Sequence, residues 1–139
     1  MTIKRAKSSA IIAPRSEAEA FFAAYPDIDS VEMIYTDFGG VPRGKRLRQH
    51  EVLSVYEIGR FFPGSIAVVD ITGQDTVETG LVWEDGDADR SMKPIPGTLV
   101  RTPWAGDNAA QFMVDFYELD GQPHDLEPRH VLGLVVDRF

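Results

Sequence analysis

The sequence predicts one α+β domain built on a mixed or antiparallel sheet. Apolar residues recur at helical spacing in some segments, and in others every second residue is apolar. These segments follow the order helix, hairpin, helix and strands, which is typical of α+β architecture. With 139 residues, of which 43% are hydrophobic and 26% charged, the chain is long enough to bury one core.

Residues 1–15 show no hydrophobic period, and we expect them to form a disordered arm. A short amphipathic helix follows, with Ser16 as its N-cap and Pro26 as its stop. The next segment predicts a strand with one face more buried, because Val31, Met33 and Tyr35 alternate with Glu32, Ile34 and Thr36.

The turn Asp37-Phe38-Gly39-Gly40 predicts a hairpin, because its glycines tolerate the positive φ of tight turns. Residues 41–48 then form the return strand, which is polar and basic on its outer face. An apolar stripe over residues 52–58 predicts a second helix, with Gly59 as its C-terminal stop.

The stretch over residues 62–75 is the best candidate for function. It opens with the turn Pro63-Gly64-Ser65 and continues through an apolar run, residues 66–71, that predicts a strand. It ends in a polar loop that carries Asp70 and Asp75. Loops held by a rigid scaffold often carry binding and catalytic residues.

An acidic loop is expected over residues 83–90. The proline-rich residues 92–104 leave room for at most a short edge strand over residues 98–101. Residues 110–119 alternate well and predict a strand, and Pro128 suits the first position of a final helix. Because this helix is strongly apolar, it must pack on this domain or lead into a second one.

Composition excludes several classes of function. Cysteine is absent, which rules out disulfides and thiolate metal sites and fits a cytoplasmic protein. The net charge of −8 argues against a nucleic-acid partner, and no run of about eighteen apolar residues suggests a membrane span. Asp85, Asp87 and Asp89 fail the calcium-loop pattern, so no metal site is expected.

Neither a nucleophile elbow nor a phosphate-binding loop occurs in the sequence. Arg43, Lys45 and Arg46 leave two interpretations open, contact with an anion or an ordinary charged strand face. The residues by themselves therefore indicate a small α+β domain without a self-contained active site.

Four segments together resemble the amino-terminal domain of the glutamine synthetase family. They are the hairpin at residues 36–46 with its Arg-Gly-Lys return strand, the Pro-Gly-Ser loop, the acidic and proline segment at residues 87–98, and Glu127-Pro128-Arg129. Their order and spacing carry the resemblance, which extends from about residue 16 to the end. The combination looks most like the branch that acts on amines, such as γ-glutamylputrescine synthetase.

The resemblance implies a β-grasp, ubiquitin-like fold, in which a mixed sheet has flanking helices, over residues 16–125. Residues 126–139 would begin the helix that leads to a catalytic domain outside this chain. The full-length protein would be an ATP-dependent ligase that phosphorylates the γ-carboxylate of glutamate, with Mg²⁺ or Mn²⁺, before an amine attacks. ATP and metal would bind the catalytic domain, so the fragment alone is expected to be inactive.

In this family the small domain completes the active site of a neighbouring subunit in a homo-oligomeric ring. Its loop supplies an aspartate for ammonium, and Pro63 stands at the matching place here. The resemblance thus implies that Pro63, Gly64 and Ser65 face a substrate pocket for an amine larger than ammonium. Asp70 or Asp75 would be candidates to replace the lost charge. The alternative is a stand-alone ubiquitin-like binding or regulatory module without catalysis.

Overall fold

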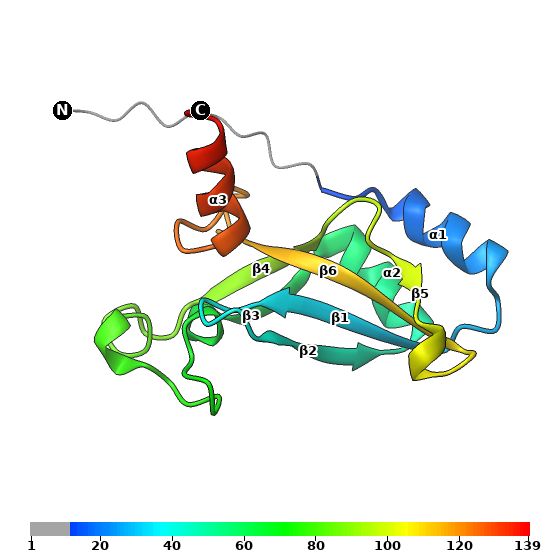
Figure 1. Ribbon diagram of the computed structural model, residues 1–139, viewed down its shortest axis with the longest axis horizontal. Helices are drawn as coiled ribbons and strands as arrows, with labels where there is room; N and C mark the ends of the chain where they lie inside the picture. Colours follow the sequence, from blue (N-terminus) through cyan, green and yellow to red (C-terminus); the bar gives the residue numbers. More distant parts are fainter. Residues whose placement is uncertain (1–11) are drawn as a thin grey trace.

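The computed structural model describes residues 12–139, which form a six-stranded mixed sheet with flanking helices (Figure 1). The strand order is β2-β1-β6-β4-β3, and β5 pairs with β6 beside this path. The strands are β1 (Ser30–Thr36), β2 (Pro42–Leu47), β3 (Arg60–Pro63), β4 (Asp89–Pro94), β5 (Val100–Arg101) and β6 (Ala109–Tyr117). The helices are α1 (Arg15–Ala24), α2 (Gln49–Ile58) and α3 (Pro128–Val136), with short 3₁₀ turns at Gly64–Ala67, Val77–Thr79 and Pro103–Ala105.

Strand β1 lies between an antiparallel and a parallel neighbour, which makes the sheet mixed. It pairs antiparallel with β2, so that Val31 lies opposite Leu47, and parallel with β6, so that Met33 lies opposite Phe112. The helix and hairpin order predicted from the sequence is confirmed, and the arrangement is the β-grasp fold.

The core lies between the sheet and the pair of helices α1 and α2. Buried residues alternate along β1 and β6, as the period of a strand requires. Phe112 of β6 is fully buried, and its ring lies 5.4 Å from that of Tyr56 on α2. Helix α2 ends at Gly59, whose φ of 83° suits a glycine, as predicted.

The first helix begins earlier than the sequence indicated. Pro14, and not Ser16, occupies the N-cap of α1 and makes no side-chain cap. Ala13 is buried, and its backbone N–H donates to the Pro94 carbonyl at 3.0 Å. Residues 13–15, which the prediction placed in the arm, thus pack on the domain or begin α1. Residues 1–11 lie outside the described part of the chain.

Two strand predictions in the middle of the chain were wrong. Residues 66–71 form no strand. The strand here is β3, which comes earlier and ends at Pro63, the first residue of the Pro-Gly-Ser turn. Strand β4 was missed, although it pairs with both β3 and β6. Its Pro94 lies at the very end of the strand, where a missing N–H does least harm.

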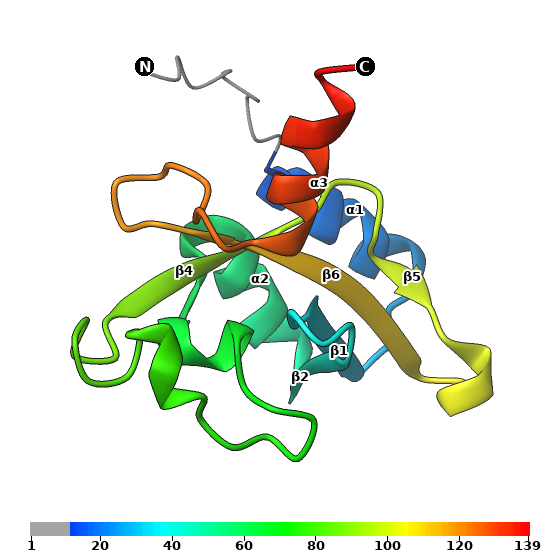
Figure 2. The same ribbon diagram turned by 60° about the vertical axis from the view of Figure 1, so that its left-hand side comes forward.

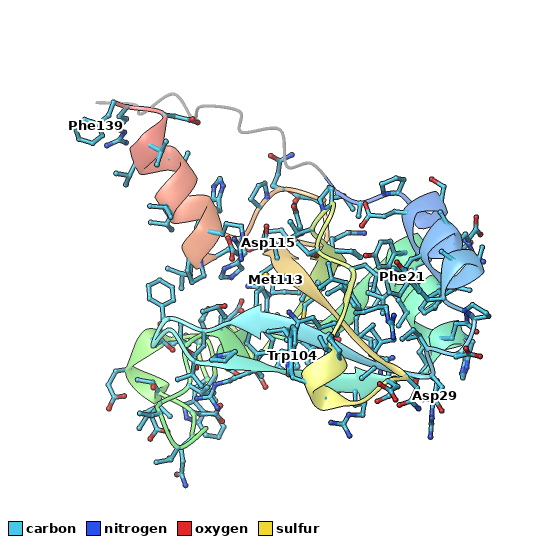
Figure 3. The ribbon with its side chains drawn as sticks, turned by 45° about the vertical axis from the view of Figure 1, so that its right-hand side comes forward. Phe21, Asp29, Trp104, Met113, Asp115 and Phe139 are labelled. Atoms are coloured by element: carbon cyan, nitrogen blue, oxygen red, sulfur yellow. The ribbon has the colours of Figure 1, made fainter. Side chains whose placement is uncertain are left out.

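Helix α3 leads away from the sheet, as Figure 3 shows by the distant position of Phe139. None of its residues is buried, and several apolar ones are exposed, namely Val131, Leu132, Val135, Val136 and Phe139. Its first turn is anchored, because the Glu127 carboxylate accepts from the His130 N–H and Arg129 Nε donates to Asp115 Oδ1 at 3.0 Å. The helix therefore does not bury its apolar face on this domain. Within residues 12–139 no helix is long and apolar enough to cross a membrane.

Candidate functional site

The candidate site lies in a long excursion of the chain between β3 and β4, residues 64–88. The two strands are antiparallel, with Pro63 opposite Asp89, and the Gly64 N–H donates to the Ala88 carbonyl at 3.0 Å. This pairing closes the excursion at its base, which we call the neck. Figure 2 shows the excursion, in green, projecting beyond the strands. Three large apolar side chains are exposed on it, namely Ile71, Val77 and Trp83.

Pro63, Gly64 and Ser65, which are predicted to face a substrate pocket and which we call the Pro63 edge, differ in exposure. Pro63 is the last residue of β3 and is partly exposed. Gly64 and Ser65 are buried, with Ser65 only 3% exposed. A Cβ on Gly64 would lie 3.5 Å from Arg90 Cγ, so this glycine packs on the arginine side chain. Pro63 is therefore the member of the edge that presents surface outside the domain.

The carboxylate of Asp70 shapes its own turn. Its Oδ1 accepts hydrogen bonds from the Thr72 N–H, the Thr72 hydroxyl and the Gln74 N–H, at 2.7 to 2.9 Å. The Thr72 hydroxyl is the largest of the effects that lower the pKa of Asp70. Asp75 follows this turn and is exposed. Asp70 is thus an ionised group already engaged by its turn, and both carboxylates belong to exposed residues.

Two arginines that hold the excursion were not identified as site residues from the sequence. Arg43 of β2 donates from Nη2 to the Asp70 carbonyl at 2.7 Å. Arg90 of β4 forms ion pairs with Asp85 at 2.8 Å and Glu118 at 3.0 Å, and it donates to the Ala88 carbonyl at 2.9 Å. Arg43 was considered only as an anion contact, and Arg90 fell within a segment interpreted as an acidic loop.

The basic residues on β2 fit an ordinary charged strand face better than an anion-binding site. They line a groove of about 510 Å³. Arg43 pairs with the buried Asp37, and Arg46 pairs with Glu32 at 2.9 Å. Lys45 Nζ lies 4.9 Å from the centre of the Phe62 ring. These cations are therefore engaged within the domain. Among residues 12–139 no group of three or more acidic or histidine side chains is placed to hold a metal ion.

His124 lies beside the neck and is 4% exposed. Its Nδ1 accepts from the Leu126 N–H at 3.1 Å, which places the proton of the neutral ring on Nε2. Nε2 lies 3.6 Å from Glu118 Oε1. Burial is the main effect that lowers the pKa of His124, and it outweighs the opposing charge of Glu118.

The stability of the protein should therefore fall in mild acid through His124. The unfolded chain takes up a proton near the ordinary pKa of 6.5, while the folded chain resists it until a lower pH, so stability is lost as pH falls below 6.5. We expect His124→Asn to remove this loss, because the asparagine oxygen still accepts from Leu126 and does not titrate. Urea unfolding of the wild type and of His124→Asn at pH 7.5 and 5.5 measures this loss of stability.

At each pH, the contribution of His124 is the difference in unfolding free energy between the wild type and the His124→Asn variant. The raised pKa values of Asp115 and Glu127, both caused mainly by burial, act in the opposite direction but are common to both proteins. Unfolding free energies that change in parallel between the two pH values would contradict this role of His124.

Comparison with known proteins places these features in a family. No protein-family model matches the chain. The chain is 37% identical over 119 residues to γ-glutamylputrescine synthetase PuuA of Escherichia coli (strain K12), covering 84% of this chain and 25% of that protein. It is 32% identical over 126 residues to γ-glutamylethanolamide synthetase of Streptomyces coelicolor, covering 88% of this chain and 27% of that protein. The chain thus spans about a quarter of the length of these relatives.

Solved structures agree with the fold. A complex of GmaS with ADP superposes with a TM-score of 0.62 at 24% identity, covering 88% of this chain and 25% of that one. Glutamine synthetase of Plasmodium falciparum superposes with a TM-score of 0.63 at 21% identity, covering 95% of this chain and 23% of that one. Sequence and fold together show that this chain is homologous to the amino-terminal β-grasp domain of the glutamine synthetase family.

Proposed function

We propose that the chain is the amino-terminal domain of an ATP-dependent glutamate–amine ligase of the γ-glutamylputrescine synthetase type. The observation that carries the proposal is the 37% identity to PuuA over 84% of this chain. The names of two further relatives, γ-glutamylethanolamide synthetase and glutamate–isopropylamine ligase, also specify amines larger than ammonia. In this proposal the Pro63 edge lies at the amine end of an active site in a neighbouring subunit of a homo-oligomeric ring.

In this proposal the residues of this chain contribute to amine binding and not to phosphoryl transfer. We assign ATP and Mg²⁺ or Mn²⁺ to a catalytic domain, as in the proposed ligase, and we expect the fragment alone to be inactive. Amide formation requires a neutral amine nitrogen to attack the activated γ-carbonyl carbon as phosphate leaves. Pro63 offers an apolar edge to the carbon chain of the amine and no carboxylate to an ammonium ion.

Two apolar surfaces support an assembled protein. One is the excursion, where Ile71 is 84% and Trp83 79% exposed, and we assign it to the neighbouring subunit. The other is α3, where Leu132 is 61% exposed, and we assign it to the catalytic domain of the same chain. Both surfaces stand apart from the body of the domain, since α3 leads away from the sheet and the excursion projects beyond the strands (Figures 1 and 2).

Replacing Pro63 by aspartate should shift preference toward ammonium in the full-length enzyme. The new carboxylate would favour a small cation and would place an unfavourable charge against the carbon chain of a larger amine. We expect the ratio of kcat/KM for ammonium over that for an alkylamine to rise by about tenfold, which corresponds to about 1.4 kcal/mol. Phosphate release with glutamate, ATP and a panel of amines measures this ratio.

Pro103→Asp provides the matched control, since Pro103 is also exposed and begins the 3₁₀ turn Pro103–Ala105. In Figure 1 this turn lies at the end of the sheet away from the excursion. Pro103→Asp should leave the ratio unchanged. Ser65→Ala tests the buried part of the edge and should change amine affinity if Ser65 supports the pocket. Unchanged kinetics of the Pro63 and Ser65 variants across ammonia and several amines would refute the assignment of this edge.

The alternative, a stand-alone module, is tested by the reading frame beyond Phe139. Continuation for several hundred residues supports the ligase, because the relatives are about four times as long as the matched segment. A stop codon directly after Phe139 supports the module.

A further inference from the structure

The end of the β1–β2 hairpin forms a platform beneath the first part of the excursion. The Phe38 N–H donates to the Ala67 carbonyl at 2.9 Å, and the Tyr35 hydroxyl donates to the Ile66 carbonyl at 3.3 Å. Arg43 adds a third link, from Nη2 to the Asp70 carbonyl. The hairpin therefore contacts residues 66–70 directly after the Pro-Gly-Ser turn.

Arg43 is itself fixed by a buried carboxylate. Its Nε donates to Asp37 Oδ2 at 2.5 Å, and Asp37 is 2% exposed. Asp37 Oδ1 accepts from the Val41 N–H at 2.8 Å, which closes the hairpin turn. Burial raises the pKa of Asp37, but the bonds from Arg43 and Val41 outweigh it, and the net shift is downward. The pair is therefore ionised at neutral pH, and the planar guanidinium bridges two acceptors at fixed angles.

The turn that Arg43 holds is rigid in its own right. Besides the three bonds to the Asp70 carboxylate, the Asp70 N–H donates to the Gln74 carbonyl at 2.8 Å and the Gly73 N–H donates to the Asp70 carbonyl at 2.9 Å. Gly73 has a φ of 87°, and a Cβ there would lie 3.3 Å from Arg43 Nη1. Glycine thus provides both the turn conformation and the close approach of the arginine.

We propose that Arg43 is a positioning residue that fixes the excursion against the hairpin and thereby sets the place of the Pro63 edge. The two hydrogen bonds of Arg43, one to Asp37 and one to the Asp70 carbonyl, connect the sheet rigidly to the turn at residues 70–74. The consequence for catalysis rests on the proposed function, in which this edge contacts the amine. A small displacement of a substrate-positioning element can reduce catalysis by up to about a hundredfold.

The test compares Arg43→Gln, Arg43→Lys and the control Arg46→Gln in the full-length protein. Arg46 lies on the same strand, but its side chain is 69% exposed and pairs with Glu32. We expect Arg43→Gln to raise the KM for the amine about tenfold and to leave the KM values for glutamate and ATP within about twofold. Arg43→Lys should recover part of the loss, because an ammonium keeps the charge but not the two-acceptor geometry.

Hydrogen exchange of the amides at residues 70–74 provides a readout that needs no substrate. Arg43→Gln should speed this exchange and Arg46→Gln should not. Unchanged exchange, or a uniform drop in kcat with all KM values preserved, would overturn the positioning role. A wild-type enzyme that uses none of the amines would refute the proposed function, while the exchange data would still decide whether Arg43 holds the turn.

Discussion

Gly44→Ala is expected to destabilise the protein by about 3 kcal/mol or more. A Cβ on Gly44 would lie 1.8 Å from the carbonyl oxygen of Met33 and 2.8 Å from its carbonyl carbon. Both atoms belong to the backbone of β1, so relief requires moving one strand away from the other. Urea unfolding followed by circular dichroism measures the loss.

The control for this substitution is Gly133→Ala in α3. No atom lies within 4 Å of a Cβ at that position, and alanine favours a helix interior over glycine by up to about 1 kcal/mol. This variant should be as stable as the wild type or slightly more stable. Equal stability of the Gly44 and Gly133 variants would show that β2 can shift on β1 at little cost.

Local periodicity was sufficient to predict the part of the fold where one strand face is buried. Val31, Met33 and Tyr35 were predicted to share a face, and all three are buried. Pro128 was predicted at the first helical position and occupies it. Such patterns can be predicted because the side-chain period of an element repeats along its own sequence.

Strand β4 could not be predicted in the same way. It carries Arg90 and Pro94, two residue types that argue against an interior strand, yet both are buried. The arginine is accommodated because Asp85 and Glu118 converge on it from either side of β4 in the sequence. Burial of that kind depends on which distant segments meet, and a single sequence does not specify it.

The candidate site, too, has features that local sequence predicts and contacts between distant segments that it does not predict. The Pro-Gly-Ser turn and the carboxylates after it could be located from turn signals and from the family resemblance. The contact of Arg43 with Asp70 joins residues 27 positions apart and depends on the hairpin folding under the excursion. The motif Arg-Gly-Lys indicated that these residues matter, but only the structure gives Gly44 and Arg43 separate physical roles.

Arg90→Met is expected to destabilise the protein by about 2 kcal/mol and to open the neck of the excursion. Methionine keeps an apolar stem of similar length but loses both ion pairs and the bond to the Ala88 carbonyl. Removing one partner of a buried pair costs about 3–5 kcal/mol. We expect less here, because the Asp85 and Glu118 side chains are 33% and 39% exposed and remain hydrated after the change. Thermal or urea unfolding measures this loss.

Arg46→Met is the matched control, because its ion pair with Glu32 is solvent-exposed and should contribute less than about 1 kcal/mol. Hydrogen exchange then locates the effect of Arg90. The Gly64 amide, which donates to Ala88 across the neck, should exchange faster in Arg90→Met and at the wild-type rate in Arg46→Met. A loss of stability without faster exchange at Gly64 would mean that Arg90 supports the sheet and that the backbone bond alone closes the neck. Faster exchange at Gly64 would instead mean that the buried guanidinium holds Pro63 in place from below, as Arg43 holds the turn at residues 70–74 from the hairpin.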